Sequence, residues 1–217
     1  MTNDRFSAKK TLAAILAICL VIAAVLPIPF GGYKKMWARF TEEPIDYTYV
    51  LVHGMGGWGE DAGMNSITPY WGSTTGSISA YLRSNGYLVK EATVGPFSSA
   101  WDRACELYAQ LMGTKVDYGE AHSKAHGHER FGRTYLEPLV ENWGTKTDGG
   151  QMRKINLIGH SFGGNTVRLL TSLLEYGSEA EMNATPDDCS PLFEGGKGEY
   201  VNSVTTLCSP HNGSTLF

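Results

Sequence analysis

One serine lies in a sequence setting that could make it a nucleophile. Residues 159–163 read GHSFG, a GxSxG motif with Ser161 at its centre, between an apolar run at 155–158 and a helical stretch. There the chain must turn from strand to helix within about two residues, which strains the serine backbone and exposes its hydroxyl. The motif predicts a serine that attacks an acyl carbonyl. The alternative is that Ser161 only caps the helix, as serine often does.

A second motif could stabilise the charge that such an attack creates. Residues 53–58 read HGMGGW and directly follow the apolar run 47–52. In α/β-hydrolase folds the loop after this strand supplies one backbone N–H to the oxyanion, and the residue after the nucleophile supplies another. We therefore expect the N–H groups of Met55 and Phe162 to bind the oxyanion, each contributing about 3–4 kcal/mol of transition-state stabilisation. A simple tight turn would also account for the glycines.

Histidines suggest a metal site. His122, His126 and His128 crowd a glycine-rich segment. An imidazole pair with a carboxylate suits zinc, whose structural sites have four ligands and no open position. From the residues alone, loop histidines are more often solvated than bound to a metal. Asp102 also has another use, because residues 99–102 fit a capping box in which its carboxylate satisfies a helix start.

The elements around these motifs alternate between short apolar runs and helical stretches, which is typical of an α/β fold with a mostly parallel sheet and helices on both faces. Helical spacing places Trp101, Cys105, Tyr108 and Met112 on one face. The segment 113–147, rich in glycine, histidine and charge, is expected to be an insertion with little regular structure. The remaining expectations are strands at 47–52, 87–94, 155–158 and 200–208, and helices at 77–84 and 163–176, the latter ended by Gly177.

Composition bounds the possible functions. A chain of 217 residues with 42% hydrophobic content can bury one core, which we expect over residues 45–217. The net charge of −4 and the lack of a basic stripe argue against nucleic-acid binding, and no protein partner is implied. Cys105, Cys189 and Cys208 are widely spaced, so no disulfide framework is expected and each is predicted to be a small buried hydrophobe.

The N-terminus carries an export pattern. Arg5, Lys9 and Lys10 precede twenty uncharged residues at 11–30, which include Cys19. A basic region followed by an apolar one is typical of a secretory signal peptide. Twenty apolar residues could also span a bilayer as a retained anchor. We expect residues 1–32 to be a signal peptide and the protein to be secreted, with a membrane anchor as the alternative.

The remaining catalytic groups are harder to place. In this fold the chain order is serine, acid, histidine, with the last two after later strands. His211 is the sole histidine after Ser161, and it would need Asp187 or Asp188 as its acid. We expect instead that acid and base lie beyond Phe217, so that the fold is incomplete at its C-terminus and the chain alone is inactive. An uncovered strand at 200–208 would then lower solubility.

Essentially all of residues 45–217 resembles the thermoalkalophilic bacterial lipases, a secreted triacylglycerol lipase family. Stretches this long are far more specific than GxSxG. They are LVHG (51–54), GWG (57–59), VGP (94–96), WDRACE (101–106), VDYG (116–119), AH (121–122), GH (127–128), RFGRTY (130–135), SPLFEGG (190–196) and residues 205–216.

The resemblance implies hydrolysis of long-chain acylglycerols at lipid interfaces and a structural zinc. Asp102, His122 and His128 match three zinc ligands, a fourth Asp would lie beyond this chain, and His126 is expected to face solvent. A lid, the catalytic acid and base, and a calcium site also belong to the part of the family that follows the matched region. Phe162 replaces the family's usual glutamine, and Met55 replaces its usual aromatic residue, which puts the acyl-chain preference in doubt.

Two other functions stay open. The same serine turn supports acyl transfer to an alcohol or thioesterase chemistry. Alternatively, the chain is a non-catalytic remnant that binds lipid or metal.

Overall fold

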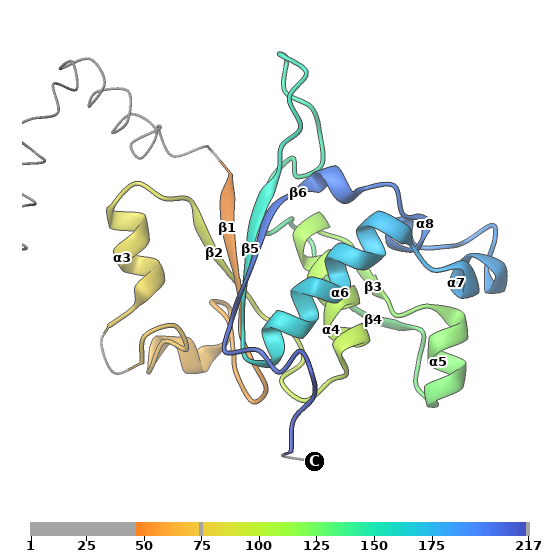
Figure 1. The fold of residues 1–217 in the computed structure, drawn as a ribbon, viewed down its shortest axis with the longest axis horizontal. Coiled ribbons are helices and arrows are strands. Elements are labelled where there is room, and N and C mark those ends of the chain that lie inside the picture. Colours follow the sequence, from red (N-terminus) through yellow and green to blue (C-terminus); the bar gives the residue numbers. More distant parts are fainter. Residues whose placement is uncertain (1–46, 74–75, 216–217) are drawn as a thin grey trace, which may run out of the picture. The chain divides into compact units, whose positions relative to one another are not determined.

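A four-stranded parallel sheet organises the part of the chain that the computed structural model describes, residues 47–73 and 76–215 (Figure 1). All three strand pairings are parallel, so the strands share one carboxyl edge. The four predicted strands are confirmed, with the second one shorter than expected. In spatial order the strands are β2 (Val89–Ala92), β1 (Thr48–Val52), β5 (Ile155–His160) and β6 (Val201–Leu207).

Helices cover both faces of the sheet (Figure 1). Helix α3 (Ile78–Ser84) packs on one side, and helices α4 (Ala100–Met112) and α6 (Phe162–Tyr176) pack on the other. Because side chains alternate along a strand, Val50 and Val52 enter the core under α4 and α6, and Leu51 enters the smaller core with Trp71. The predicted α/β architecture and all three predicted helices are therefore confirmed.

The helix α4 forms where the sequence places its ends. The Ser99 hydroxyl accepts the Asp102 N–H at the start, and Gly113 ends the helix in a left-handed conformation with φ of 68°. Cys105 and Tyr108 are buried in the main core, and Trp101 and Met112 pack against it. The face predicted from helical spacing is thus the face that packs on the sheet.

The prediction of little regular structure in segment 113–147 is wrong. This segment contains β3 (Lys115–Asp117), α5 (Glu120–His126) and β4 (Phe131–Thr134), and β3 pairs antiparallel with β4. The guanidinium of Arg130 holds the pair together by donating to both carboxylate oxygens of Asp117, at 2.9 and 2.8 Å. Elements of three to seven residues are too short to leave a periodic hydrophobic pattern, which is why the sequence did not reveal them.

Short helical elements complete the described part of the chain. They are η1 (Gly63–Ser66), α7 (Glu179–Ala184), α8 (Pro191–Glu194) and η2 (Gly198–Tyr200). No helix within residues 47–73 and 76–215 has the length and apolarity needed to cross a membrane. The predicted signal peptide or anchor at 1–32, with Cys19, lies outside the described residues.

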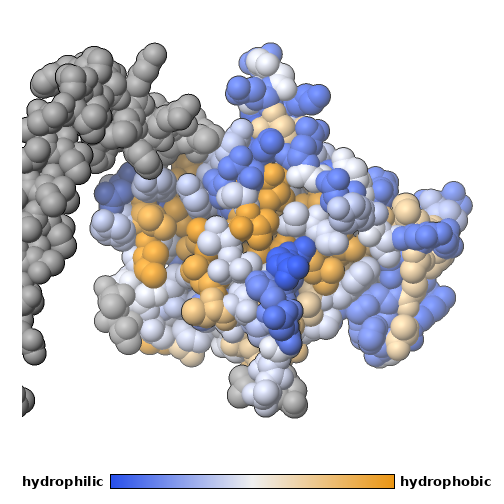
Figure 2. Space-filling view, in the orientation of Figure 1, coloured by the Kyte–Doolittle hydropathy of each residue, from blue (hydrophilic) through white to orange (hydrophobic). Residues whose placement is uncertain are grey.

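The three cysteines in the described part of the chain differ in exposure, and none forms a disulfide. Cys105 is buried as predicted, Cys189 is half-buried, and Cys208 is exposed, so the expectation of burial is wrong for Cys208. Cys208 follows the edge strand β6, which no further described strand covers. Val204 and Leu207 on this strand are 37% and 42% exposed. Figure 2 shows apolar side chains gathered on the visible face over the sheet and α3.

Candidate active site

The sheet topology brings the two sequence motifs together at the carboxyl ends of neighbouring strands. Strands β1 and β5 are neighbours, but the chain runs from β1 outward to β2 and from β5 outward to β6, in opposite directions (Figure 1). In open α/β sheets, ligands bind outside the carboxyl ends of the strands at such a switch point. The loop 53–58 follows β1 and Ser161 follows β5, so both lie at this position.

Ser161 has a strained backbone. Its φ of 54° and ψ of −127° lie outside the regions that residues with a side chain prefer, at a cost of about 1–3 kcal/mol. Its N–H donates to the Leu207 carbonyl at 2.8 Å, which ties the turn to the end of β6. The Ser161 side chain makes no capping hydrogen bond to α6. The explanation of Ser161 as a simple helix cap is therefore wrong.

Glycines allow the backbone segments to meet around this turn. A Cβ at Gly163 would lie 2.2 Å from the Val52 carbonyl oxygen, and one at Gly54 would lie 2.8 Å from Cβ of Ser161. Neither distance is compatible with a side chain. The loop after β1 consequently sits directly against the serine turn.

Three side chains hold this loop. The buried Arg103 guanidinium donates to the carbonyls of His53 and Gly95 and, at 2.9 Å, to the Thr166 hydroxyl. Burial lowers the pKa of Arg103 to about 10, so it stays charged at neutral pH. The Gly54 N–H donates to the Tyr70 hydroxyl at 2.9 Å.

Tyr70 also connects the loop to the strand that carries the serine. Its hydroxyl lies 2.6 Å from Nδ1 of His160, the residue before Ser161. The hydroxyl accepts the Gly54 N–H, and it donates to or accepts from Nδ1 according to the tautomer of His160. One phenol thereby bridges two segments 90 residues apart.

His53 is the third of these side chains, and it is buried and neutral. Burial lowers its pKa to about 4, with a further contribution from the Arg103 charge. Its Nδ1 lies 2.8 Å from the Gly54 carbonyl, and its Nε2 accepts the Val94 N–H at 3.2 Å. Nδ1 is thus used within the loop and Nε2 by the segment after β2, so this histidine is a structural group and has no free nitrogen to act as a base.

The two predicted oxyanion donors are free to bind a ligand. Within residues 47–73 and 76–215, neither the Met55 N–H nor the Phe162 N–H has a hydrogen-bond acceptor. Phe162 is the first residue of α6, where N–H groups lack intrahelical partners. Met55 is 42% exposed at the surface of the loop.

A largely apolar cavity of about 450 Å³ opens beside the serine turn. Trp58, Trp71 and Ile78 contribute apolar side chains to it, and His160 and Leu207 border it at the carboxyl ends of β5 and β6. A lipophilic group next to Ser161 would fit this environment.

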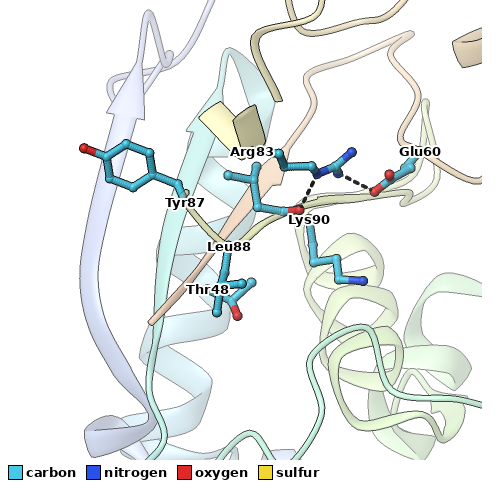
Figure 3. Close-up of a pocket in the computed structure, with 7 residues that line it drawn as sticks. Thr48, Glu60, Arg83, Tyr87, Leu88 and Lys90 are labelled. Carbon is cyan, nitrogen blue, oxygen red and sulfur yellow. Dashed lines mark hydrogen bonds and ion pairs between the residues drawn. The ribbon is translucent and has the colours of Figure 1, made fainter. Parts of the chain in front are cut away.

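A second hollow, of about 390 Å³, lies at the opposite end of the strands (Figure 3). Thr48 lines it at the start of β1, together with Arg83 and Lys90. The Arg83 guanidinium donates to two other lining residues, to Glu60 at 2.8 Å and to the Val89 carbonyl at 2.9 Å (Figure 3). Its charge is therefore already paired, and we assign no chemistry to this hollow.

The alternative triad is not formed in the described part of the chain. Nε2 of His211 lies 3.0 Å from the Thr206 hydroxyl. The Asp188 carboxylate accepts from Arg130 at 3.1 Å, and Asp187 is exposed. No hydrogen bond joins any of these groups to Ser161.

The structure brings the three predicted metal ligands together. Nε2 of His122 and Nε2 of His128 lie 3.1 and 3.7 Å from Oδ1 of Asp102. One ligand atom from each residue lies within 4.8 Å of the others. His126 is exposed, as expected, and is not part of this group, although its ring centroid lies 4.3 Å from that of His122.

The donor set fits a zinc ion. The capping interpretation of Asp102 accounts for only half of its carboxylate, because Oδ2 accepts the Ser99 hydroxyl at 2.8 Å while Oδ1 faces both histidines. Burial lowers the pKa of His122, which favours the neutral ring that a metal requires. The His122 ring also stacks on Trp101 at 5.1 Å, which fixes its orientation.

Residues 45–216 match the model of a protein family described as "Lipase-like, C-terminal domain". The chain belongs to this lipase family. A lipase of Staphylococcus epidermidis strain RP62A is 44% identical to this lipase-family chain over 168 residues, which cover 76% of the chain and 23% of that lipase. Lipase 1 of Staphylococcus aureus strain Mu50 is 37% identical over 206 residues, covering 88% of the chain and 29% of that enzyme. The chain thus spans roughly a quarter of the length of these relatives.

Two solved structures are similar in fold. Lipase 1 from Pelosinus fermentans superimposes with a TM-score of 0.73 at 51% identity, covering 79% of this chain and 43% of that one. Staphylococcus hyicus lipase superimposes with a TM-score of 0.70 at 39% identity, covering 80% and 44%. The predicted resemblance to bacterial lipases is confirmed.

Sequence reasoning did not identify Tyr70 or Arg103 as groups that position the site. A signal existed for Arg103. It is a charged residue at helical spacing from Leu107 and Leu111, on a helix face that is otherwise apolar. No local signal existed for Tyr70, because its partners Gly54 and His160 are distant in sequence.

Proposed function

We propose that this chain is the nucleophile-bearing part of a secreted carboxylester hydrolase with the α/β-hydrolase fold, and specifically of a triacylglycerol lipase. The observation that carries the proposal is the strained turn at Ser161, whose hydroxyl caps nothing, beside two N–H groups without acceptors. A serine hydroxyl not used as a cap and nearby N–H groups without acceptors support nucleophilic attack with oxyanion stabilisation.

The proposed reaction proceeds in two steps. The Ser161 hydroxyl attacks the ester carbonyl, and the Met55 and Phe162 N–H groups bind the negative oxygen that forms. The alcohol then leaves with a proton, and water hydrolyses the acyl-enzyme. We propose that the acid and base come from outside this chain, since no described histidine is hydrogen-bonded to Ser161 and the relatives are longer.

The proposed substrate is a lipid ester. The apolar cavity lined by Trp58, Trp71 and Ile78 lies next to the nucleophile and could receive an acyl chain. The similar proteins are named lipases, which supports the same substrate class. Secretion is proposed from the basic and apolar pattern at 1–32.

We also propose that Asp102, His122 and His128 hold a structural zinc ion, with a fourth ligand supplied from outside the chain. When bound, zinc would cross-link α4 to α5 and to the loop that follows α5, without taking part in ester chemistry.

The decisive experiment separates the nucleophile from the completeness of the site. We expect the 217-residue chain alone to show no turnover of a p-nitrophenyl ester, and a longer product of the same gene to hydrolyse it. Ser161→Ala should abolish both hydrolysis and labelling by a fluorophosphonate in the longer product, while Ser172→Ala should retain both. Ser161-dependent turnover by the 217-residue chain would contradict the proposal of an external base, and activity that survives Ser161→Ala would overturn the nucleophile assignment.

Two further functions are kept because specific observations favour them. The same serine turn would support acyl transfer, and product analysis with a competing alcohol distinguishes transfer from hydrolysis. The lack of a bonded histidine at Ser161 favours a non-catalytic remnant that binds lipid or metal. A coding sequence that stops directly after the Phe217 codon would support that alternative.

A further inference from the structure

A buried carboxylate on α7 lies behind the proposed metal ligands. Glu181 is only 2% exposed. Its two oxygens accept the backbone N–H groups of Ala121 and His122, at 2.9 and 2.8 Å. These amides belong to the first turn of α5, where helices leave N–H groups without partners. The residue before the helix, Gly119, has no side chain to satisfy them, so a residue 59 positions after His122 does so instead.

The local backbone is shaped to admit this carboxylate. A Cβ at Gly119 would lie 2.3 Å from Cδ of Glu181, and its φ of 89° also favours glycine. On the other side, the N–H of Glu181 is bonded to the hydroxyl of Ser178, which caps α7. The backbone of Glu181 is therefore fixed by the cap of α7, and its carboxylate binds the first turn of α5.

One residue, His122, connects Glu181 to the proposed metal ligands. The amide of His122 is bonded to Glu181, and its ring lies 3.1 Å from Asp102. Helix α5 has seven residues, too few to be stable without tertiary contacts. The orientation of the His122 ring relative to α4 thus depends on where Glu181 anchors the first turn of α5.

We propose that Glu181 is a positioning residue for the metal site. It aligns His122 with Asp102 through the backbone of α5 and does not itself contact the ion. This inference rests on the proposed zinc site, and the test below distinguishes failure of one from failure of the other.

The experiment compares metal binding by the longer product of the same gene, which would carry the proposed fourth ligand, and by its variants. Glu181→Gln keeps the side-chain shape but loses one acceptor, because its NH2 group cannot accept an N–H. Glu179→Gln, an exposed change on the same helix, is the matched control, and His122→Ala is the reference for a lost ligand. Zinc affinity is measured by chelator competition, and ligand geometry by the visible spectrum of the cobalt-substituted protein, at a temperature where circular dichroism shows all variants folded.

The wild-type longer product should bind about one zinc ion. Glu181→Gln should weaken binding by about 10-fold or more, as is typical for groups that orient metal ligands, and should alter the cobalt spectrum. Glu179→Gln should leave both unchanged. A loss of global stability alone would not change the cobalt spectrum of folded protein.

The outcomes separate the two proposals. If the wild-type longer product binds no zinc, the metal site itself is rejected. If it binds zinc and Glu181→Gln has the same affinity and spectrum, the positioning role is overturned and the metal site stands. If Glu181→Gln does not fold, Gly119→Ala replaces it, because the new Cβ displaces the carboxylate. If that variant also fails, hydrogen exchange at the His122 amide of the zinc-bound wild type decides: protection supports the proposal, and rapid exchange overturns it.

Discussion

At the scale of single residues, the candidate site depends on polar side chains that bind backbone. Arg103, His53 and Tyr70 each contact the loop after β1, and none of them is a predicted reacting group. Such contacts matter because oxyanion donors act only when their N–H groups are already aligned before the reaction. The chemistry of this site therefore extends beyond the GxSxG serine to residues that fix its surroundings.

Removing the Tyr70 hydroxyl should slow the reaction without weakening substrate binding. In Tyr70→Phe the Gly54 N–H and His160 each lose their partner, so the loop and the serine turn are no longer held together. We expect kcat of the proposed longer hydrolase to fall about tenfold, equivalent to ~1.4 kcal/mol, with KM nearly unchanged. Steady-state kinetics on a soluble ester measure this. Tyr81→Phe, at a 68% exposed position, is the control, and equal kinetics for both variants would reject the role of Tyr70.

Burial of neutral His53 predicts a specific loss of stability in acid. Its pKa is about 4 in the folded state and 6.5 when exposed, so between these values the unfolded chain binds a proton that the folded chain does not. The free energy of unfolding should consequently fall as the pH drops from 6.5 toward 4, by roughly 3 kcal/mol from this group. Urea unfolding at pH 7 and pH 4.5 tests it. His53→Gln should show a smaller pH dependence than the wild type, whereas His211→Gln should not; identical pH dependence in all three would contradict the prediction.

At the scale of elements, the position of the first turn of α6 determines the geometry of the site. The helix starts immediately after the strained Ser161, and its first turn packs against the end of β1. This packing brings the first N–H of the helix and the loop after β1 to the same place. Any side chain at the contact would separate them.

Gly163→Ala should therefore destabilise the protein although alanine is the better helix former. The new Cβ would lie 2.2 Å from the Val52 carbonyl oxygen, which forces α6 away from β1. Overpacking of this kind costs about 1–3 kcal/mol, beyond the ~1 kcal/mol gained in helix propensity. Urea unfolding gives the difference. Gly63→Ala is the control, because no atom lies within 4 Å of a Cβ at this position, and it should change stability by less than about 0.5 kcal/mol. Equal effects of the two substitutions would contradict the prediction.

At the scale of the whole molecule, the sheet ends in an edge strand with exposed apolar side chains. Strand β6 pairs only with β5 among the described residues, and Val204 and Leu207 remain partly exposed. Unpaired strand edges promote association between chains. The two helix-covered faces, by contrast, are fully buried around Val50 and Leu51.

We expect the 217-residue chain to self-associate through this edge. Light scattering should show an apparent mass that rises with concentration, and the double substitution Val204→Lys and Leu207→Lys should reduce the rise, because charge on an edge strand opposes pairing. Leu136→Lys, at a 92% exposed position elsewhere, should have little effect. A wild-type chain that stays monomeric at high concentration would contradict this expectation.

The sequence by itself determined the features that depend on neighbouring residues. The strand, turn and helix around Ser161, the cap at Ser99 and the stop at Gly177 all follow from short-range patterns, so they were predicted correctly. Only the tertiary structure decided the contacts between distant segments. Tyr70 meets His160 across 90 residues and Glu181 meets His122 across 59, and such pairs leave no periodic or local trace in the chain. For the same reason the small elements of segment 113–147 were missed, since they are stabilised by long-range hydrogen bonds and packing rather than by their own propensity.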